Sequence, residues 1–277
     1  MRISKSAPAV LLAAVALSNL GCSSTKPGPV ASPEKVCRDK FAEAKKEFDK
    51  KNDAEAQTKL RDISVSCAGY DVVEEAQWLL GESHYRTEQW LEAETEYGIL
   101  VQNFERSKHA EEARWKICRA SWNEAPPWDR DPSLTQKAME REESFLLDYP
   151  KGRWSDSART DLADLTARMA ERRFETARLY QKMDEPQAAT IYFNLLLKEF
   201  PTSDKVGPTR LWLARAYSDL NQFDRASESL DSLVLDSARA KLQGEKIGKE
   251  RSRLQSARKD FDARKAREAA EAKQGQL

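Results

Sequence analysis

The chain has 277 residues, no formal net charge at pH 7, 33% charged residues and a mean hydropathy of −0.75. With 10 Gly and 11 Pro in a sequence rich in Ala, Glu, Leu, Arg and Lys, the composition favours long helices in a thin architecture with much surface. A neutral whole offers no electrostatic basis for binding nucleic acid, so we expect no nucleic-acid partner.

The N-terminal segment has the pattern of a targeting signal. Arg2 and Lys5 precede an apolar run over residues 7–17, which is too short to cross a bilayer as a mature helix. We therefore predict that residues 1–21 are a signal peptide and that the mature protein lies outside the cytoplasm.

A cysteine follows this apolar run directly after a small residue. The sequence Leu20-Gly21-Cys22-Ser23 resembles a bacterial lipoprotein box, and the serine after the cysteine resembles the pattern that sorts lipoproteins to the outer membrane. We predict that Cys22 carries lipid and that residues 22–33, rich in Ser, Pro and Lys, form a flexible tether. The alternative is ordinary secretion that leaves Cys22 unmodified.

The folded part is predicted to consist of five helical hairpins. A small residue followed by an aromatic occurs twice, twelve residues apart: first Ala177 and Tyr180, then Ala189 and Phe193. Pro201 ends the second helix, and this is the tetratricopeptide (TPR) spacing. The expected pairs are 33–50 with 53–66, 73–86 with 91–103, 111–122 with 135–149, 155–184 with 186–200, and 204–220 with 223–235.

The cysteines fit an oxidising compartment. Cys37 is near the start of the first predicted helix and Cys67 near the end of the second, and those two ends are neighbours in an antiparallel hairpin. We predict a Cys37–Cys67 disulfide, the alternative being two buried thiols. Cys118 occupies a small-residue packing position and is predicted to be a core thiol.

The third and fourth pairs depart from the ordinary repeat. The turn of the third pair is enlarged to residues 123–133, with two prolines, a tryptophan and the charged run Asp129-Arg130-Asp131. The first helix of the fourth pair runs over residues 155–184 without Pro or Gly, or roughly 45 Å.

The tail after residue 236 carries 12 Lys or Arg against 6 Asp or Glu. Ile247, Leu254 and Phe261 stand seven apart and form a single apolar stripe, which we interpret as too narrow to make a core. The tail is therefore expected to be a solvated helix, or one that binds a partner or anionic phospholipid.

First helices line the concave face of a TPR array. If Gly81, Cys118, Ala177 and Ala214 are equivalent, the residue after each faces the groove, and arginine there suits a carboxylate. The predicted groove residues are the four that follow, Glu82, Arg119, Arg178 and Arg215, with the aromatics Trp78, Tyr85, Trp115 and Trp122. The alternative is that the aromatics are core between repeats and the arginines pair with acidic residues of neighbouring repeats.

Nothing in the sequence indicates catalysis. His84 and His109 are the only histidines, and no metal-binding spacing or Gly-rich phosphate loop accompanies them. We expect no enzyme activity, no metal and no cofactor, and we expect His84 to be a packed core histidine.

The enlarged Asp129-Arg130-Asp131-Pro132 loop, the segment 128–150 and the long fourth-pair helix resemble the BamD family of β-barrel assembly factors, over about residues 22–235. The resemblance implies a right-handed, non-catalytic TPR solenoid with repeats one to three in 34–150, repeats four and five in 151–235 and a tail in 236–277. It also implies that pairs four and five bind BamA, that other BAM components take part, and that pairs one to three bind the C-terminal signal of unfolded outer-membrane proteins. The residues expected to bind partners are Asp129, Arg130, Asp131, Arg178, Tyr192 and Arg215.

One position departs from the family pattern. The basic residue with which the family contacts BamA falls on Tyr192 here, so that ion pair is not expected in this chain. The alternative function is that of another periplasmic TPR lipoprotein, in Tol-Pal or envelope division complexes.

Overall fold

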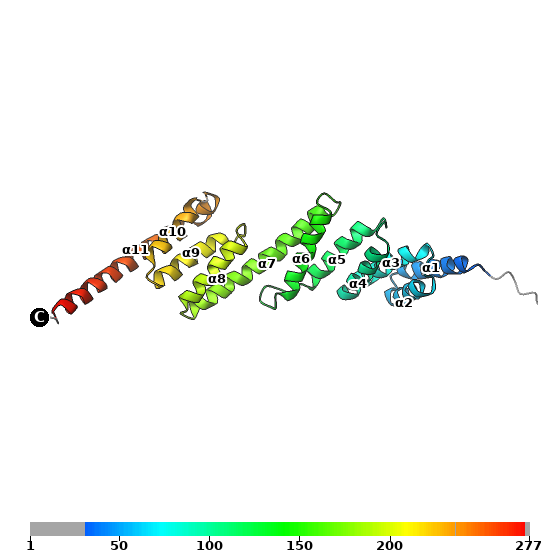
Figure 1. Cartoon of the computed structure of the whole chain (residues 1–277), viewed down its shortest axis with the longest axis horizontal. Coiled ribbons are helices and arrows are strands. Elements are labelled where there is room, and N and C mark those ends of the chain that lie inside the picture. Colours follow the sequence, from blue (N-terminus) through cyan, green and yellow to red (C-terminus); the bar gives the residue numbers. More distant parts are fainter. Residues whose placement is uncertain (1–30, 236, 275–277) are drawn as a thin grey trace, which may run out of the picture.

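The computed structural model describes residues 31–235 and 237–274, and within these ranges every regular element is an α-helix. Figure 1 shows the helices following one another along an elongated molecule. In chain order they are α1 (Pro33–Asp49), α2 (Asp53–Ser66), α3 (Val72–Arg86), α4 (Trp90–Asn103), α5 (Ala110–Glu124), α6 (Ser133–Asp148), α7 (Ser155–Lys182), α8 (Pro186–Glu199), α9 (Val206–Asp219), α10 (Phe223–Leu235) and α11 (Ser237–Gln274).

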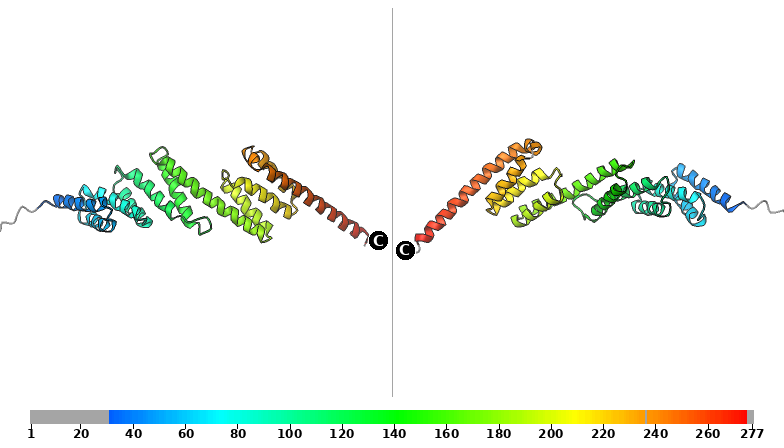
Figure 2. Two further views of the ribbon diagram at one scale, coloured as in Figure 1. Left: turned by 180° about the vertical axis from the view of Figure 1, so that it is seen from behind. Right: turned by 45° about the horizontal axis from the view of Figure 1, so that its top comes forward.

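The helices form a solenoid of five hairpins in which each layer packs on the next. Contacts join helices that are adjacent in sequence, together with successive first helices such as α5 and α7 or α7 and α9. The first described helix and the end of α11 lie at opposite ends of the array in all three views (Figures 1 and 2). The predicted all-α TPR-like fold is therefore confirmed, and most predicted helix ends agree with the structure within about two residues.

Four of the five hairpins turn through the same backbone motif. After the first helix, one residue adopts a left-handed conformation with φ between 58° and 61°, and the next helix begins two residues later. The amide after that residue donates to the carbonyl five residues back, as in a Schellman C-cap. The four left-handed residues are Lys51, Glu88, Asp184 and Asn221.

Small residues set the distance between the paired helices. A Cβ on Gly81 would lie 2.6 Å from the ring of Tyr97, which is fully buried between α3 and α4. A larger residue at position 81 would therefore push the two helices apart. Ala93, twelve residues on, is also fully buried, in agreement with the predicted repeat spacing.

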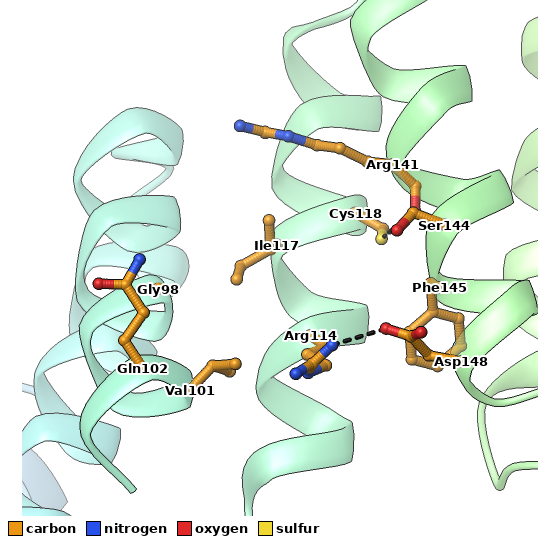
Figure 3. Close-up of a pocket in the computed structure, with 10 residues that line it drawn as sticks. All are labelled: Gly98, Val101, Gln102, Arg114, Ile117, Cys118, Arg141, Ser144, Phe145 and Asp148. Atoms are coloured by element: carbon orange, nitrogen blue, oxygen red, sulfur yellow. Dashed lines mark hydrogen bonds and ion pairs between the residues drawn. The ribbon is translucent and has the colours of Figure 1, made fainter. Parts of the chain in front are cut away.

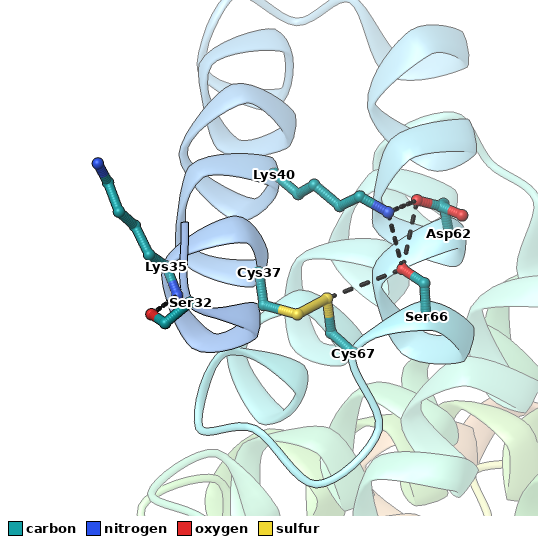
Figure 4. Close-up of a disulfide and its surroundings, with 7 residues drawn as sticks. All are labelled: Ser32, Lys35, Cys37, Lys40, Asp62, Ser66 and Cys67. Carbon is teal, nitrogen blue, oxygen red and sulfur yellow. Dashed lines mark hydrogen bonds and ion pairs between the residues drawn. A yellow bond between two sulfur atoms is a disulfide. The ribbon is translucent and has the colours of Figure 1, made fainter. Parts of the chain in front are cut away.

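A disulfide closes the first hairpin. It joins Cys37 in the first turns of α1 to Cys67 at the end of α2, with the two Cα atoms 5.8 Å apart (Figure 4). Beside it, the Lys40 ammonium donates to the Asp62 carboxylate and to the Ser66 hydroxyl. The predicted pairing is therefore present, in the first hairpin of the solenoid.

Removing this disulfide is expected to destabilise the protein. The C37A/C67A variant should lose about 3–4 kcal/mol of unfolding free energy, because the bridge closes a loop with a sequence separation of 30 residues. Urea unfolding followed by circular dichroism measures the difference. Reductant should lower the stability of the wild type to that of the variant. It should leave the effect of Cys118→Ala unchanged, since Cys118 is a free buried thiol.

The apolar stripe of the tail packs against the last hairpin, so its interpretation as too narrow for a core is wrong. Ile247 is 5% exposed in a cluster with Leu211 and Leu230, and the rings of Phe261 and Phe223 lie 5.5 Å apart. Three residues are enough because α9 and α10 supply the rest of the core. The C-terminal part of α11 projects past the other helices (Figure 1).

Within residues 31–235 and 237–274, no helix is both long and apolar enough to cross a bilayer. The predicted signal peptide, Cys22 and most of the predicted tether lie outside the described residues.

Candidate functional site

The predicted groove residues lie on the face formed by the first helices, and they connect each first helix to the next. Glu82 on α3 pairs with Lys116 on α5 at 3.0 Å. Arg119 on α5 pairs with Asp161 on α7 at 2.5 Å. Every predicted side chain thus meets a partner from the following layer rather than solvent alone.

The same arrangement continues toward the C-terminal end. The Arg178 guanidinium on α7 lies 5.3 Å from the ring centroid of Trp212 on α9. The Arg215 guanidinium on α9 lies 4.7 Å from the same ring centroid and bonds to Glu250 on α11. The alternative that arginines pair with acidic residues of neighbouring repeats is therefore what the structure shows for Arg119 and Arg215.

Two of the predicted groove aromatics are packing groups between repeats. The Trp78 ring stacks on His109 with centroids 4.3 Å apart, and the Trp115 ring stacks on Trp154 at 4.1 Å. His109 and Trp154 each stand directly before the next first helix. Trp78 is 8% exposed, so its assignment to an open groove is wrong, because the following repeat covers it.

Tyr85 and Trp122 remain half-buried on the first-helix face. The Lys116 ammonium lies 4.3 Å from the Tyr85 ring centroid. The guanidiniums of Arg119 and Arg168 lie 4.4 and 5.0 Å from the Trp122 ring centroid. Arginine on an aromatic face keeps hydrogen-bond donors at the ring edge. The face therefore offers flat aromatic surface flanked by positive charge, which suits an extended polypeptide.

A cluster of buried ionisable groups lies beneath this face, between α5, α6 and α7. Asp161 is 5% exposed, and Glu142 is fully buried with neither carboxylate oxygen hydrogen-bonded. Burial, reinforced by the charge of Asp161, raises the pKa of Glu142 to about 8, while Arg119 opposes the shift. The Glu142 carboxyl is therefore protonated at neutral pH.

The free cysteine belongs to the same region. Cys118 is 3% exposed and its thiol donates to the Arg141 carbonyl at 3.4 Å. Burial raises the pKa of this thiol, so it stays protonated. The prediction of a core thiol is confirmed. His84 is likewise buried at 4% exposure, with Nδ1 2.6 Å from Oε1 of Gln89, as expected for a packed histidine.

On the opposite side, a groove of about 280 Å³ runs between α4 and α6 over α5 (Figure 3). Val101, Ile117 and Phe145 give it an apolar lining, and Gly98, having no side chain, leaves its rim open. The Arg114–Asp148 ion pair, at 2.6 Å, crosses its end.

The enlarged loop of the third hairpin is held against the long helix α7. It spans residues 125–132, because α5 extends to Glu124 and α6 begins at Ser133, so the predicted bounds of 123–133 were too wide. Arg168 donates to the Ala125 carbonyl at 2.9 Å. Arg172 donates to the carbonyls of Trp128 and Arg130.

This anchoring leaves the tip of the loop at the surface. Trp128 is 41% exposed and Leu134, in the first turn of α6, is 44% exposed. Asp129 and Arg130 are exposed beside them, and the Asp131 carboxylate accepts from the Ser133 amide at 2.7 Å. Hydrogen bonds from the Ser133 hydroxyl and, second, from its amide lower the pKa of Asp131. The loop thus presents an apolar ring among charges, the composition of many protein-binding sites.

Tyr192 lies on α8, the second helix of the fourth hairpin, and is half-buried. Its ring stacks on Tyr180 of α7 with centroids 5.0 Å apart and planes inclined by 12°. The position therefore offers a paired aromatic surface where a basic residue was expected from the resemblance.

Sequence reasoning missed the residues that complete these contacts. Trp154, Asp161, Trp212 and Glu250 lie one layer beyond their partners, and Arg168 and Arg172 anchor the loop. A search of the next helix for an acidic partner of each predicted arginine would have found Asp161 for Arg119 and Glu250 for Arg215. The loop anchors carried no sequence signal. Within the described part of the chain, no three His, Cys, Asp or Glu side chains gather in a way that could hold a metal ion.

Comparison with known families gives a match that covers most of the solenoid. The family described as YfiO, outer membrane lipoprotein, matches residues 33–232. The chain belongs to this family. The YfiO match takes in α1 to α9 and nearly all of α10, including loop 125–132 and Tyr192, and it ends before α11.

Three similar solved structures are TPR proteins, and the sequence identity between each of them and this YfiO-family chain is low. The TPR2AB domain of yeast Sti1 in complex with pHSP90 has 14% identity and a TM-score of 0.44, over 83% of this chain and 86% of that one. A TPR protein from Parabacteroides merdae has 13% identity and a TM-score of 0.35, over 80% of this chain and 93% of that one. A thermophilic TPR protein from Thermus thermophilus has 16% identity and a TM-score of 0.32, over 80% of this chain and 98% of that one. No curated protein sequence matches significantly.

Proposed function

We propose that this protein is a non-enzymatic scaffold of the outer-membrane β-barrel assembly machinery, tethered by lipid on Cys22 to the periplasmic face of the outer membrane. The observation that carries the proposal is the YfiO outer membrane lipoprotein match over residues 33–232, on a solenoid of stacked hairpins. Such a solenoid has a long surface for polypeptides. BamA, other BAM components and unfolded barrel proteins are the proposed partners.

Two surfaces are proposed to carry the binding. Pairs four and five, with Arg178, Tyr192 and Arg215, are the proposed BamA side. The stacked Tyr180 and Tyr192 rings favour an aromatic contact there in place of an ion pair. Pairs one to three are proposed to hold the C-terminal signal of unfolded barrel proteins on the first-helix face. The half-buried rings of Tyr85 and Trp122 are its proposed contact groups, and Trp78, which is buried, contributes to packing between repeats.

Loop 125–132, with the predicted partner-binding residues Asp129, Arg130 and Asp131, is also proposed to contact BamA, and it supplies the most direct test. Replacing it with a short Gly-Ser linker, or replacing Trp128 with alanine, should lower recovery of the barrel protein by about tenfold in a pull-down from detergent-solubilised membranes. An exposed aromatic anchor in an interface is worth about 2 kcal/mol or more. The full-length tagged protein is the bait, and mass spectrometry of the eluate identifies what it retains.

Leu91→Ala serves as the matched control, since Leu91 is 59% exposed in the second hairpin and should bind like the wild type. Circular dichroism should show unchanged helix content in all variants. Recovery of a large barrel protein with repeated periplasmic domains supports the proposal. Recovery of peptidoglycan-binding or Tol proteins in its place would assign the chain to a Tol-Pal or division complex.

A further inference from the structure

A second surface lies at the C-terminal end, where α11 passes the turn between α9 and α10. The space between them is a groove of about 560 Å³. Arg253, Arg264 and Arg267 line it from α11, and Asn221 and Phe223 line it from the α9–α10 turn. The C-terminal part of α11 projects beyond the other helices (Figures 1 and 2).

The three arginines of this groove differ from the other arginines nearby. Arg251 bonds to Asp231 and Arg258 to Asp224, so these two hold α11 against α10. Within the described residues, Arg253, Arg264 and Arg267 form no ion pair or hydrogen bond. All three are on α11. Because residues three or eleven apart lie close to the same side of a helix, these arginines face one way.

The chemistry of the groove favours a polypeptide over a membrane. Three guanidiniums supply donors for carboxylates, and arginine can bind a carboxylate through two parallel hydrogen bonds. Asp219 and Asp260 line the same groove and would accept hydrogen bonds from backbone amides of a bound segment. A flat anionic bilayer cannot enter a concave groove, whereas an extended acidic segment can.

We propose that this groove binds an acidic segment of a partner polypeptide. Carboxylate side chains of the segment pair with Arg253, Arg264 and Arg267, and its backbone passes over the small residues Ala257 and Ala263 of α11. The three arginines lie on α11, beyond the YfiO family match, which ends at residue 232, whereas Asn221 and Phe223 lie within it. A segment bound in this groove would be a contact additional to those proposed above.

The test uses the mature full-length protein and a fluorescein-labelled oligo-glutamate peptide, with binding measured by fluorescence anisotropy. The R264E/R267E variant should bind the peptide at least about tenfold more weakly, because two charge-assisted contacts become repulsive. The matched control is K246E/K259E, which makes the same change in charge at two exposed lysines of α11 outside the groove. It should keep its affinity within about twofold.

The outcomes separate the possible ligands. Loss of binding in R264E/R267E with retention in K246E/K259E supports the groove. Equal losses in both variants would reduce the effect to the net charge of α11 and overturn the proposal. Groove-dependent binding to phosphatidylglycerol vesicles, without binding to the peptide, would also overturn it in favour of a membrane contact. All variants should melt at the temperature of the wild type, since both arginines are exposed.

Discussion

Replacing Arg119 with methionine is expected to lower the free energy of unfolding by about 3–5 kcal/mol. Arg119 is the charge partner of Asp161, which is 5% exposed and has one carboxylate oxygen without a hydrogen bond. Without the guanidinium, Asp161 would be left as an uncompensated buried carboxylate beside Glu142. Removing one partner of a buried pair costs this much because the other charge cannot return to water.

Urea unfolding of R119M measures the loss, and Arg159→Met provides the control. Arg159 pairs with Asp156 on the same helix as Asp161, but that pair is at the surface, where ion pairs contribute about 0–1 kcal/mol. Adding Asp161→Asn to R119M should restore part of the stability, since it removes the stranded charge. A loss in R119M no greater than in R159M would show that the buried pair is not needed for stability.

Replacing Glu142 with glutamine is expected to stabilise the protein in a pH-dependent way. The pKa of Glu142 is raised from its ordinary value of 4.5 to about 8 in the folded chain. Below pH 4.5 the carboxyl is neutral in both states and costs nothing. As the pH rises toward 8, the unfolded chain gives up the proton while the folded chain retains it, so the wild type loses stability over this range. The full loss is about 3–5 kcal/mol.

Glutamine cannot ionise, so E142Q should unfold like the wild type near pH 4.5 and should be more stable by several kcal/mol at pH 8. Thermal or urea unfolding across this pH range gives the two curves. Burial also raises the pKa of Asp161, so some pH dependence of the same sign should remain in E142Q. Glu140→Gln, an exposed position on the same helix, should follow the wild-type curve. If the difference in unfolding free energy between E142Q and the wild type does not vary with pH, the raised pKa of Glu142 is contradicted.

The helices and their pairing could be predicted because local signals repeat along the chain. Pro186 and the small–aromatic step set the fourth hairpin, and the position of two cysteines near adjacent helix ends gave the disulfide. The helix ends agreed because the caps are local: each turn needs only the residues around it.

The site could be predicted only in part, because its contacts join layers that are far apart in sequence. Trp78 and Arg119 were placed on the correct helix face, yet whether a side chain there meets solvent or the next repeat depends on the spacing of layers. The partners of Trp78 and Arg119, His109 and Asp161, lie 31 and 42 residues away. The packing of the tail was missed for the same reason, since its three apolar residues become a core only against α9 and α10.

Helix α7 has 28 residues and no interruption. Arg172, which anchors loop 125–132, and Arg178, on the proposed BamA side, are six residues apart on this helix, or about 9 Å along its axis. The two surfaces therefore share one stiff support and cannot turn relative to each other. A single partner that touches both gains avidity, because its second contact forms at high effective concentration. Two separate partners of ordinary size would compete for the space.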